Sequence, residues 1–255
     1  MKKAELGWSL KYLLGTMLQM LLAVILKTIF MSLHIENGIT AILLLAIGGT
    51  SSAVWGCMIA VKSHKVESVK QIFFDFFHLK VNWKYYLISI LFLIITFGKQ
   101  MIGLELNTGI VWYSFLILFI KSLLFGGIEE IGWRYTFQPS IETRIPYEIS
   151  SVCTFICWGL WHYMFFYITD SLSMISHASF LLGLIVICFV TGAIYNLTKS
   201  LWLCVLYHVL ANTFSQAFIA GSMQQTIITS IICIGLSVIL VRLKMPIVKE
   251  ESVCQ

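Results

Sequence analysis

The sequence predicts an all-α protein, a multi-pass transmembrane helical bundle of about eight spans that forms one membrane domain over residues 1–255. Three observations lead to this fold class. Hydrophobic residues make up 59% of the chain and charged residues only 11%, whereas a soluble domain carries about 25% charged residues. The mean hydropathy is +0.90. The few charges fall in short clusters between long apolar stretches, which is the pattern that membrane topology produces.

A helical span needs about 20 mostly apolar residues to cross about 30 Å of hydrocarbon. The first candidate follows Lys2 and Lys3 and resembles a signal peptide, but no Ala-x-Ala-like cleavage site follows it. We therefore expect a retained first span. Eight stretches qualify in all: 11–33, 38–61, 84–104, 110–128, 148–168, 178–197, 201–221 and 225–243.

The segment 61–83, between spans two and three, has a different pattern. It mixes apolar and charged residues at helical spacing, which predicts an amphipathic helix lying in the membrane interface. A short water-facing loop is the alternative. The expected apolar face consists of Ile72, Phe73, Phe76, Phe77 and Leu79, and the polar positions are Lys65, Glu67, Lys70 and Asp75.

The distribution of Lys and Arg predicts the orientation of the bundle. With eight spans, nearly all of these residues fall on one side, and the opposite side offers only Lys99. Positive residues favour the cytoplasmic side, so both termini are expected in the cytoplasm of a cell membrane. The net charge of +5 is spread over these clusters and forms no single patch. The lipid bilayer is therefore an expected partner, and nucleic acid is not.

Three clusters of polar residues interrupt the apolar stretches. An ionisable side chain at the centre of a span costs about 2.5–3.5 kcal/mol, so each cluster needs a reason. In the first, Glu130 and Arg134 are four residues apart and share a helix face as an ion pair. Glu129 points about 100° away, which leaves it free to face other helices. The alternative is a charged helix end at the interface.

The other two clusters lie inside spans five and seven. His162 is about 15 Å from the start of its apolar stretch, and His208 and Asn212 lie about 10 and 16 Å into theirs. Each cluster has a structural alternative, namely hydrogen bonding within the bundle for packing alone. Trp158, one turn before His162, is expected to pack or to anchor its helix. Because one shared cluster would satisfy these polar groups at similar depths, we infer a common site.

Such a set of side chains suits hydrolysis. A Glu with a neighbouring His can orient and deprotonate water, and a second His with an Asn amide supplies donors for an oxyanion. Alternatively, Glu129, His162 and His208 are candidate ligands of a divalent metal such as zinc, although no HExxH motif occurs. No Ser or Cys of the set has a base beside it, so a covalent mechanism is not expected. The seven cysteines form no CxxC pair, and most are expected to pack as small apolar residues.

These residues resemble the motifs of the CPBP family, the CAAX prenyl-endopeptidase-like and bacteriocin-processing membrane proteins also called the ABI family. The resemblance covers residues 110–215, which we expect to be the catalytic core. Trp158 departs from the family, which usually has Phe there. In chain order the motifs are Glu129-Glu130-x-x-x-Arg134, Trp158-x-x-x-His162, Gly192-Ala193-Ile194-Tyr195, Ser200-Leu201-Trp202 and His208-x-x-x-Asn212.

The resemblance implies an eight-helix intramembrane endopeptidase with a cavity open to the cytoplasm. By motif position, Glu129 and His162 would activate water, His208 and Asn212 would form the oxyanion hole, and Glu130 with Arg134 would brace the site. We favour this metal-free assignment over a zinc site.

The expected substrate is a membrane-associated or leader-type peptide or protein, and the short loops suggest a bacterial source. Two other function classes stay open. One is a non-catalytic bacteriocin self-immunity or partner-binding protein of the same fold. The other is a transporter or channel that uses the buried groups as an ion path. Neither the substrate's identity nor the oligomeric state follows from the sequence.

Overall fold

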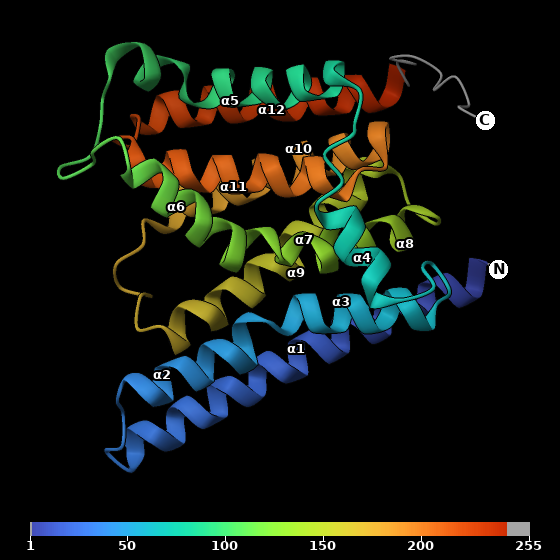
Figure 1. Ribbon diagram of the computed structural model, residues 1–255, viewed down its shortest axis with the longest axis vertical. Helices are drawn as coiled ribbons and strands as arrows, with labels where there is room; N and C mark the ends of the chain where they lie inside the picture. Colours follow the sequence, from blue (N-terminus) through green and yellow to red (C-terminus); the bar gives the residue numbers. More distant parts are fainter. Residues whose placement is uncertain (1, 244–255) are drawn as a thin grey trace.

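The computed structural model of the protein describes the backbone of residues 2–243 and the side chains from residue 6 onward. Within these residues the chain is helical throughout, and extended backbone pairs at a single isolated antiparallel bridge between Leu106 and Phe218. The predicted all-α class is therefore confirmed (Figure 1).

The first three predicted spans coincide with helices. The second is interrupted by a π-helical turn, η1, and the interface segment contains one short helix. In chain order these elements are α1 (Lys2–Ser32), α2 (Gly38–Leu44), η1 (Leu45–Gly49), α3 (Ser51–Lys62), α4 (Val69–Phe76) and α5 (Trp83–Gly103).

The fourth predicted span continues well beyond residue 128, and two more π turns divide it into short pieces. The remaining predicted spans are single helices. The elements are α6 (Ser114–Ser122), η2 (Leu123–Gly127), α7 (Glu129–Gly132), η3 (Trp133–Phe137), α8 (Gln138–Glu142), α9 (Tyr147–Ile168), α10 (His177–Thr198), α11 (Leu201–Ala217) and α12 (Met223–Leu243).

Six of the described helical segments are long and apolar enough to cross a membrane, so the chain is a membrane protein. They are the first, second, third, fifth, sixth and eighth of the predicted spans. The fourth is not among them, and α11 falls short because it has only 17 residues. The count of eight spans therefore remains a prediction. So do the division of the chain into one domain with a core at 110–215 and the side on which the termini lie.

The helix α4 is shorter than the amphipathic segment that the sequence predicts. Its residues Ile72 and Phe76 are buried, and α4 packs against α3 and α11. Phe73, Phe77 and Leu79, which were expected on the same apolar face, are 63%, 41% and 62% exposed. The helix thus has one face on the protein body and a second, apolar face directed outward. Its location in the membrane interface remains a prediction.

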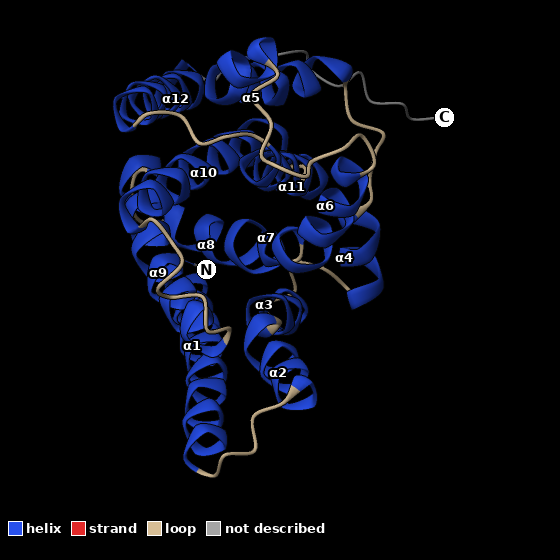
Figure 2. Ribbon diagram, turned by 90° about the vertical axis from the view of Figure 1, so that its left-hand side faces the viewer, coloured by secondary structure: helices blue, strands red, loops and turns tan. Residues whose placement is uncertain are grey.

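The helices α10 and α11 lie at the centre of the bundle and pack against each other. Both pack against α5, and α10 also packs against α12, while α9 and the pieces α6 to α8 cover their other side (Figures 1 and 2). The long helix α1 packs against α3 and α9 at the far side of the molecule. The four-residue helix α7 lies between α3 and α11, so the acidic pair that the sequence places there is enclosed on both sides.

The contact between α3 and α7 depends on two glycines. A Cβ atom added to Gly56 would lie 2.8 Å from the backbone Cα and N of Gly132. Backbone atoms cannot rotate away as a flexible side chain does, so a larger residue at either position must push the helices apart. The small residues therefore fix how close α7 comes to the first part of the bundle.

We expect Gly56→Ala to destabilise the protein by about 1–3 kcal/mol, which is typical of overpacking, and to lower the melting temperature of the purified protein in detergent. Gly235→Ala in α12 is the matched control, because no atom lies within 4 Å of its added Cβ and alanine is the better helix former. Equal melting temperatures for the two variants would show that the α3–α7 contact tolerates a side chain.

Candidate active site

The acidic pair Glu129 and Glu130 occupies the first turn of α7, between the π turns η2 and η3. A π turn inserts an extra residue into the helical repeat and rotates the side chains that follow it. Glu129 is 5% exposed and Glu130 is fully buried. Such burial requires partners for both carboxylates, and the two acids find them on different helices.

Glu129 is held by Trp158 of α9. The indole Nε1–H of Trp158 donates to Oε2 of Glu129 at 2.6 Å, and Nε2 of His162 lies 4.0 Å from the same oxygen. The expectation that Trp158 packs or anchors its helix holds for its ring, which is buried in the hydrophobic core, but it leaves out the bond that the indole N–H donates. The indole does both, because it has a polar edge as well as an apolar ring. Four residues separate Trp158 from His162, so one face of α9 presents both groups to the carboxylate.

The orientation of His162 follows from its other ring nitrogen. Nδ1 lies 3.0 Å from the backbone oxygen of Trp158, and a carbonyl oxygen can only accept, so Nδ1 carries the proton in this contact. In the neutral ring, Nε2 is then a free acceptor on the side that faces Glu129. The 4.0 Å gap between Nε2 and the carboxylate is too long for a direct hydrogen bond, but one water molecule can bridge it.

Glu130 faces the opposite way, toward α11. Its Oε1 lies 2.8 Å from Nδ1 of His208, and its Oε2 lies 3.8 Å from Nε of Arg134. The sequence predicted the second contact from the spacing of four residues but did not predict the first. The hydrogen bond of the Arg134 Nε–H is to the Thr191 hydroxyl, at 2.5 Å, whereas its contact with Glu130 is an ion pair. Arg134 therefore ties α10 to the acidic helix as well as balancing the charge of Glu130.

His208 and Asn212 converge on Gly126, at the end of η2. A Cβ atom added to Gly126 would lie 2.8 Å from Nδ2 of Asn212 and 3.3 Å from Nε2 of His208. Two nitrogens on one face of α11 thus lie beside the same point of the backbone. Glycine at this position leaves room for both side chains.

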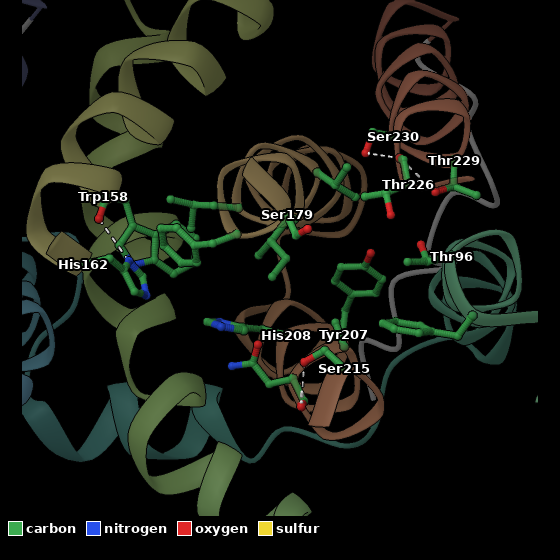
Figure 3. Close-up of a pocket in the computed structure, with 18 residues that line it drawn as sticks. Thr96, Trp158, His162, Ser179, Tyr207, His208, Ser215, Thr226, Thr229 and Ser230 are labelled. Carbon is green, nitrogen blue, oxygen red and sulfur yellow. Dashed lines mark hydrogen bonds between the residues drawn. The ribbon is translucent and has the colours of Figure 1, made fainter. Parts of the chain in front are cut away.

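A cavity of about 230 Å³ opens beside these groups, between α5, α9, α10, α11 and α12. His162, His208 and Asn212 are all among the residues that line it, whereas Glu129 is not. Figure 3 shows the two histidines at one end and the hydroxyls of Thr226 and Ser230 at the other. The walls are mainly apolar, and polar side chains lie at both ends of the cavity.

Two acid–histidine pairs, Glu129–His162 and Glu130–His208, lie around one aromatic side chain. The ring of Trp158 lies 5.3 Å, centroid to centroid, from the rings of both His162 and His208. The guanidinium carbon of Arg134 lies 4.9 Å from the same indole. Trp158 thus separates the Glu129–His162 pair from the Glu130–His208 pair and touches members of both.

The donor set does not fit a divalent metal such as zinc. Among the described residues, no three His, Cys, Asp or Glu side chains gather as a ligand set would. Glu129 and His162 form one pair, whereas His208, bonded through Nδ1 to Glu130, does not gather with them around one point. A zinc site needs at least three protein ligands around one point, so we assign no chemical step to a metal.

Sequence reasoning missed three contributors to the site. They are the Trp158 donor, the Thr191 acceptor for Arg134, and Gly126, whose missing side chain leaves room for His208 and Asn212. The Gly126-Gly127 pair, one residue before Glu129 in the sequence with Ile128 between, was the available signal for a close approach of backbone and side chains. Nothing in the local sequence singles out Thr191, because threonines are ordinary residues of apolar helices.

The geometry agrees with the comparison to known families. Residues 110–214, less than half of the chain, match the family model described as "Type II CAAX prenyl endopeptidase Rce1-like". No match to the chain is found among curated proteins. The matched segment contains the site residues described above apart from Thr226 and Ser230 of α12, and its limits agree with those of the motif resemblance at residues 110–215. The resemblance to the CPBP family is therefore confirmed: residues 110–214 match the model of the Rce1-like family, which is described as a family of prenyl endopeptidases and hence of hydrolases.

Proposed function

We propose that the protein is an intramembrane endopeptidase that hydrolyses a peptide bond of a membrane-associated or leader-type peptide. The observation that carries this proposal is the Glu129–His162 pair, 4.0 Å apart, next to a cavity that His162, His208 and Asn212 line. A base for water and donors for an oxyanion are the two requirements of direct peptide hydrolysis.

In the first step, a water molecule between the pair donates one hydrogen bond to Oε2 of Glu129 and the other to Nε2 of His162. Its oxygen lone pair is then directed at the carbonyl carbon of the substrate. As the water oxygen attacks, Glu129 accepts its proton and a tetrahedral intermediate forms. That proton then passes to the amide nitrogen, the C–N bond breaks, and a carboxylic acid and an amine leave the site.

The negative charge of the intermediate develops on the former carbonyl oxygen. Nδ2 of Asn212 donates to it directly. His208 donates from Nε2 when its ring is protonated, and the Glu130 carboxylate 2.8 Å from Nδ1 is the counter-ion for that imidazolium. Arg134 in turn keeps Glu130 in place. In this assignment Glu130 acts through His208 and never touches the substrate.

The substrate is expected to enter from the membrane, because the walls of the cavity are mainly apolar. The printed family name refers to prenylated CAAX proteins, so a lipidated C-terminal peptide is one candidate and a leader peptide is the other. We further propose a bacterial cell-membrane location with both termini in the cytoplasm, on the basis of the lysine and arginine distribution.

We expect Glu129→Gln to lower the cleavage rate at least about 100-fold, because a general base contributes about 10²- to 10⁴-fold. His162→Ala and His208→Ala should each cause a loss of similar size. The assay incubates purified protein in liposomes with a panel of prenylated peptides, their unprenylated counterparts and leader peptides, and detects products by mass spectrometry.

Glu148→Gln is the control for this series, because Glu148 pairs with Arg242 on a different part of the bundle and should retain full activity. Membrane content and melting temperature of each variant separate lost chemistry from lost fold. If the Glu129, His162 and His208 variants all cleave at the normal rate, the protein does not use this site for hydrolysis.

We expect Trp158→Phe to lower the cleavage rate about tenfold without abolishing it. Phenylalanine keeps the ring between the two histidines but has no N–H for Glu129, and a hydrogen bond to a charged group contributes about 1.5–3 kcal/mol. Trp161→Phe is the matched control, because the Nε1–H of Trp161 donates to the Ser51 hydroxyl instead. A rate unchanged by Trp158→Phe would mean that Glu129 needs no help from the indole.

We expect cleavage to persist in the presence of a strong chelator, because no three metal-ligating side chains converge in the described part of the chain. The measurement is the product yield after dialysis against chelator, compared with the untreated protein. Loss of activity that added zinc restores would contradict the metal-free assignment.

A further inference from the structure

A second polar pocket lies where several helices end, away from the catalytic cavity. It has a volume of about 260 Å³ and shares no lining residue with that cavity. Its walls come from the segment after α3, from α4 and the segment after it, from η3, and from the junction between α10 and α11. Helix ends from distant parts of the sequence thus enclose one site at one end of the bundle.

The pocket is strongly basic. Three of its lining residues are lysines, Lys65, Lys80 and Lys199, and a fourth is His78. The one carboxylate in its lining belongs to Asp75, and Oδ2 of that residue accepts the Tyr135 hydroxyl at 2.5 Å. None of the ion pairs found in the described chain involves these lysines. The positive charge of the pocket is therefore left largely unbalanced by protein groups.

Two of the ammonium groups approach one another across Tyr195. Nζ of Lys65 lies 5.2 Å from the centre of that ring, and Nζ of Lys199 lies 5.6 Å from it. The Lys65 ammonium donates to the Tyr195 hydroxyl at 3.0 Å and to the backbone oxygen of Tyr135. These bonds hold Lys65 in position although the residue as a whole is exposed.

The surroundings of Lys65 disfavour the charged form of its ammonium group. Desolvation of its ammonium, together with the charge of Lys199, lowers the pKa of Lys65 to about 7, and Asp75 opposes this shift. An anion between Lys65 and Lys199 would relieve their repulsion. Ser200 and Leu201, at the start of α11, also line the pocket, and the positive end of that 17-residue helix adds to the attraction.

We propose that this pocket binds a phosphate group through Lys65, Lys80 and Lys199. Several flexible cations around a small cavity suit a tetrahedral anion, which accepts hydrogen bonds from many directions. The proposal is independent of the peptidase assignment. Two sources can supply the group: the headgroup of an anionic lipid or free inorganic phosphate. The exposed side chains of Phe73, Phe74 and Phe77, on and directly after α4, favour the lipid.

The test uses the full-length protein in neutral detergent. The double variant Lys80→Gln/Lys199→Gln removes two charges at exposed positions and leaves the bonded Lys65 intact. Lys84→Gln is the matched control, because Lys84 is exposed near the start of α5 and does not line the pocket. Native mass spectrometry measures retention of phosphatidylglycerol against phosphatidylcholine, and calorimetric titration measures binding of inorganic phosphate.

We expect wild type and Lys84→Gln to retain phosphatidylglycerol preferentially. The double variant should bind about 20-fold more weakly, since each lysine near a membrane surface contributes about fivefold. Loss of phosphatidylglycerol binding alone would support a lipid headgroup, and loss of inorganic phosphate binding would support the free ion. Binding of neither probe by the wild type, or an equal loss in Lys84→Gln, would overturn the proposal.

Discussion

The hydrogen bond from the Trp158 indole to Glu129 is the contact on which the candidate site depends. A carboxylate enclosed among helices needs a donor, and this bond supplies one at a fixed direction. The same ring touches both histidines and the Arg134 guanidinium. One side chain therefore sets the separation of the two acid–histidine pairs. Phenylalanine, which the family usually has here, would keep the spacing and give up the donor.

The second constraint is the backbone that presents the acids. Two π turns flank α7, and glycines at positions 56, 126 and 132 allow close packing around it. Neighbouring carboxylates can then face different helices, with Glu129 toward α9 and Glu130 toward α11. A regular, uninterrupted helix through this segment would keep the angle of about 100° between them but would not give the shift in register. The glycines and the π turns thus place the two carboxylates toward different helices.

Much of this arrangement follows from the sequence. Hydropathy predicts the helices, and the spacing of Glu130 and Arg134 predicts their contact and the separate role of Glu129. The depth of His162, His208 and Asn212 predicts that they share a site. The remaining features depend on tertiary packing. An aromatic residue in an apolar helix gives no sign that its N–H meets a carboxylate, as Trp158 shows, and the π turns on either side of α7 leave no periodic signature in the sequence.

The length of α11 has a consequence for the surrounding lipid. Its 17 residues reach only about 25 Å at 1.5 Å per residue, whereas the hydrocarbon layer is about 30 Å thick. If α11 crosses the bilayer, the mismatch can be relieved by thinning of the bilayer around this part of the bundle. His208 and Asn212 lie on this helix, so such thinning would bring headgroups and their water nearer to both residues than the midplane of an undisturbed membrane allows.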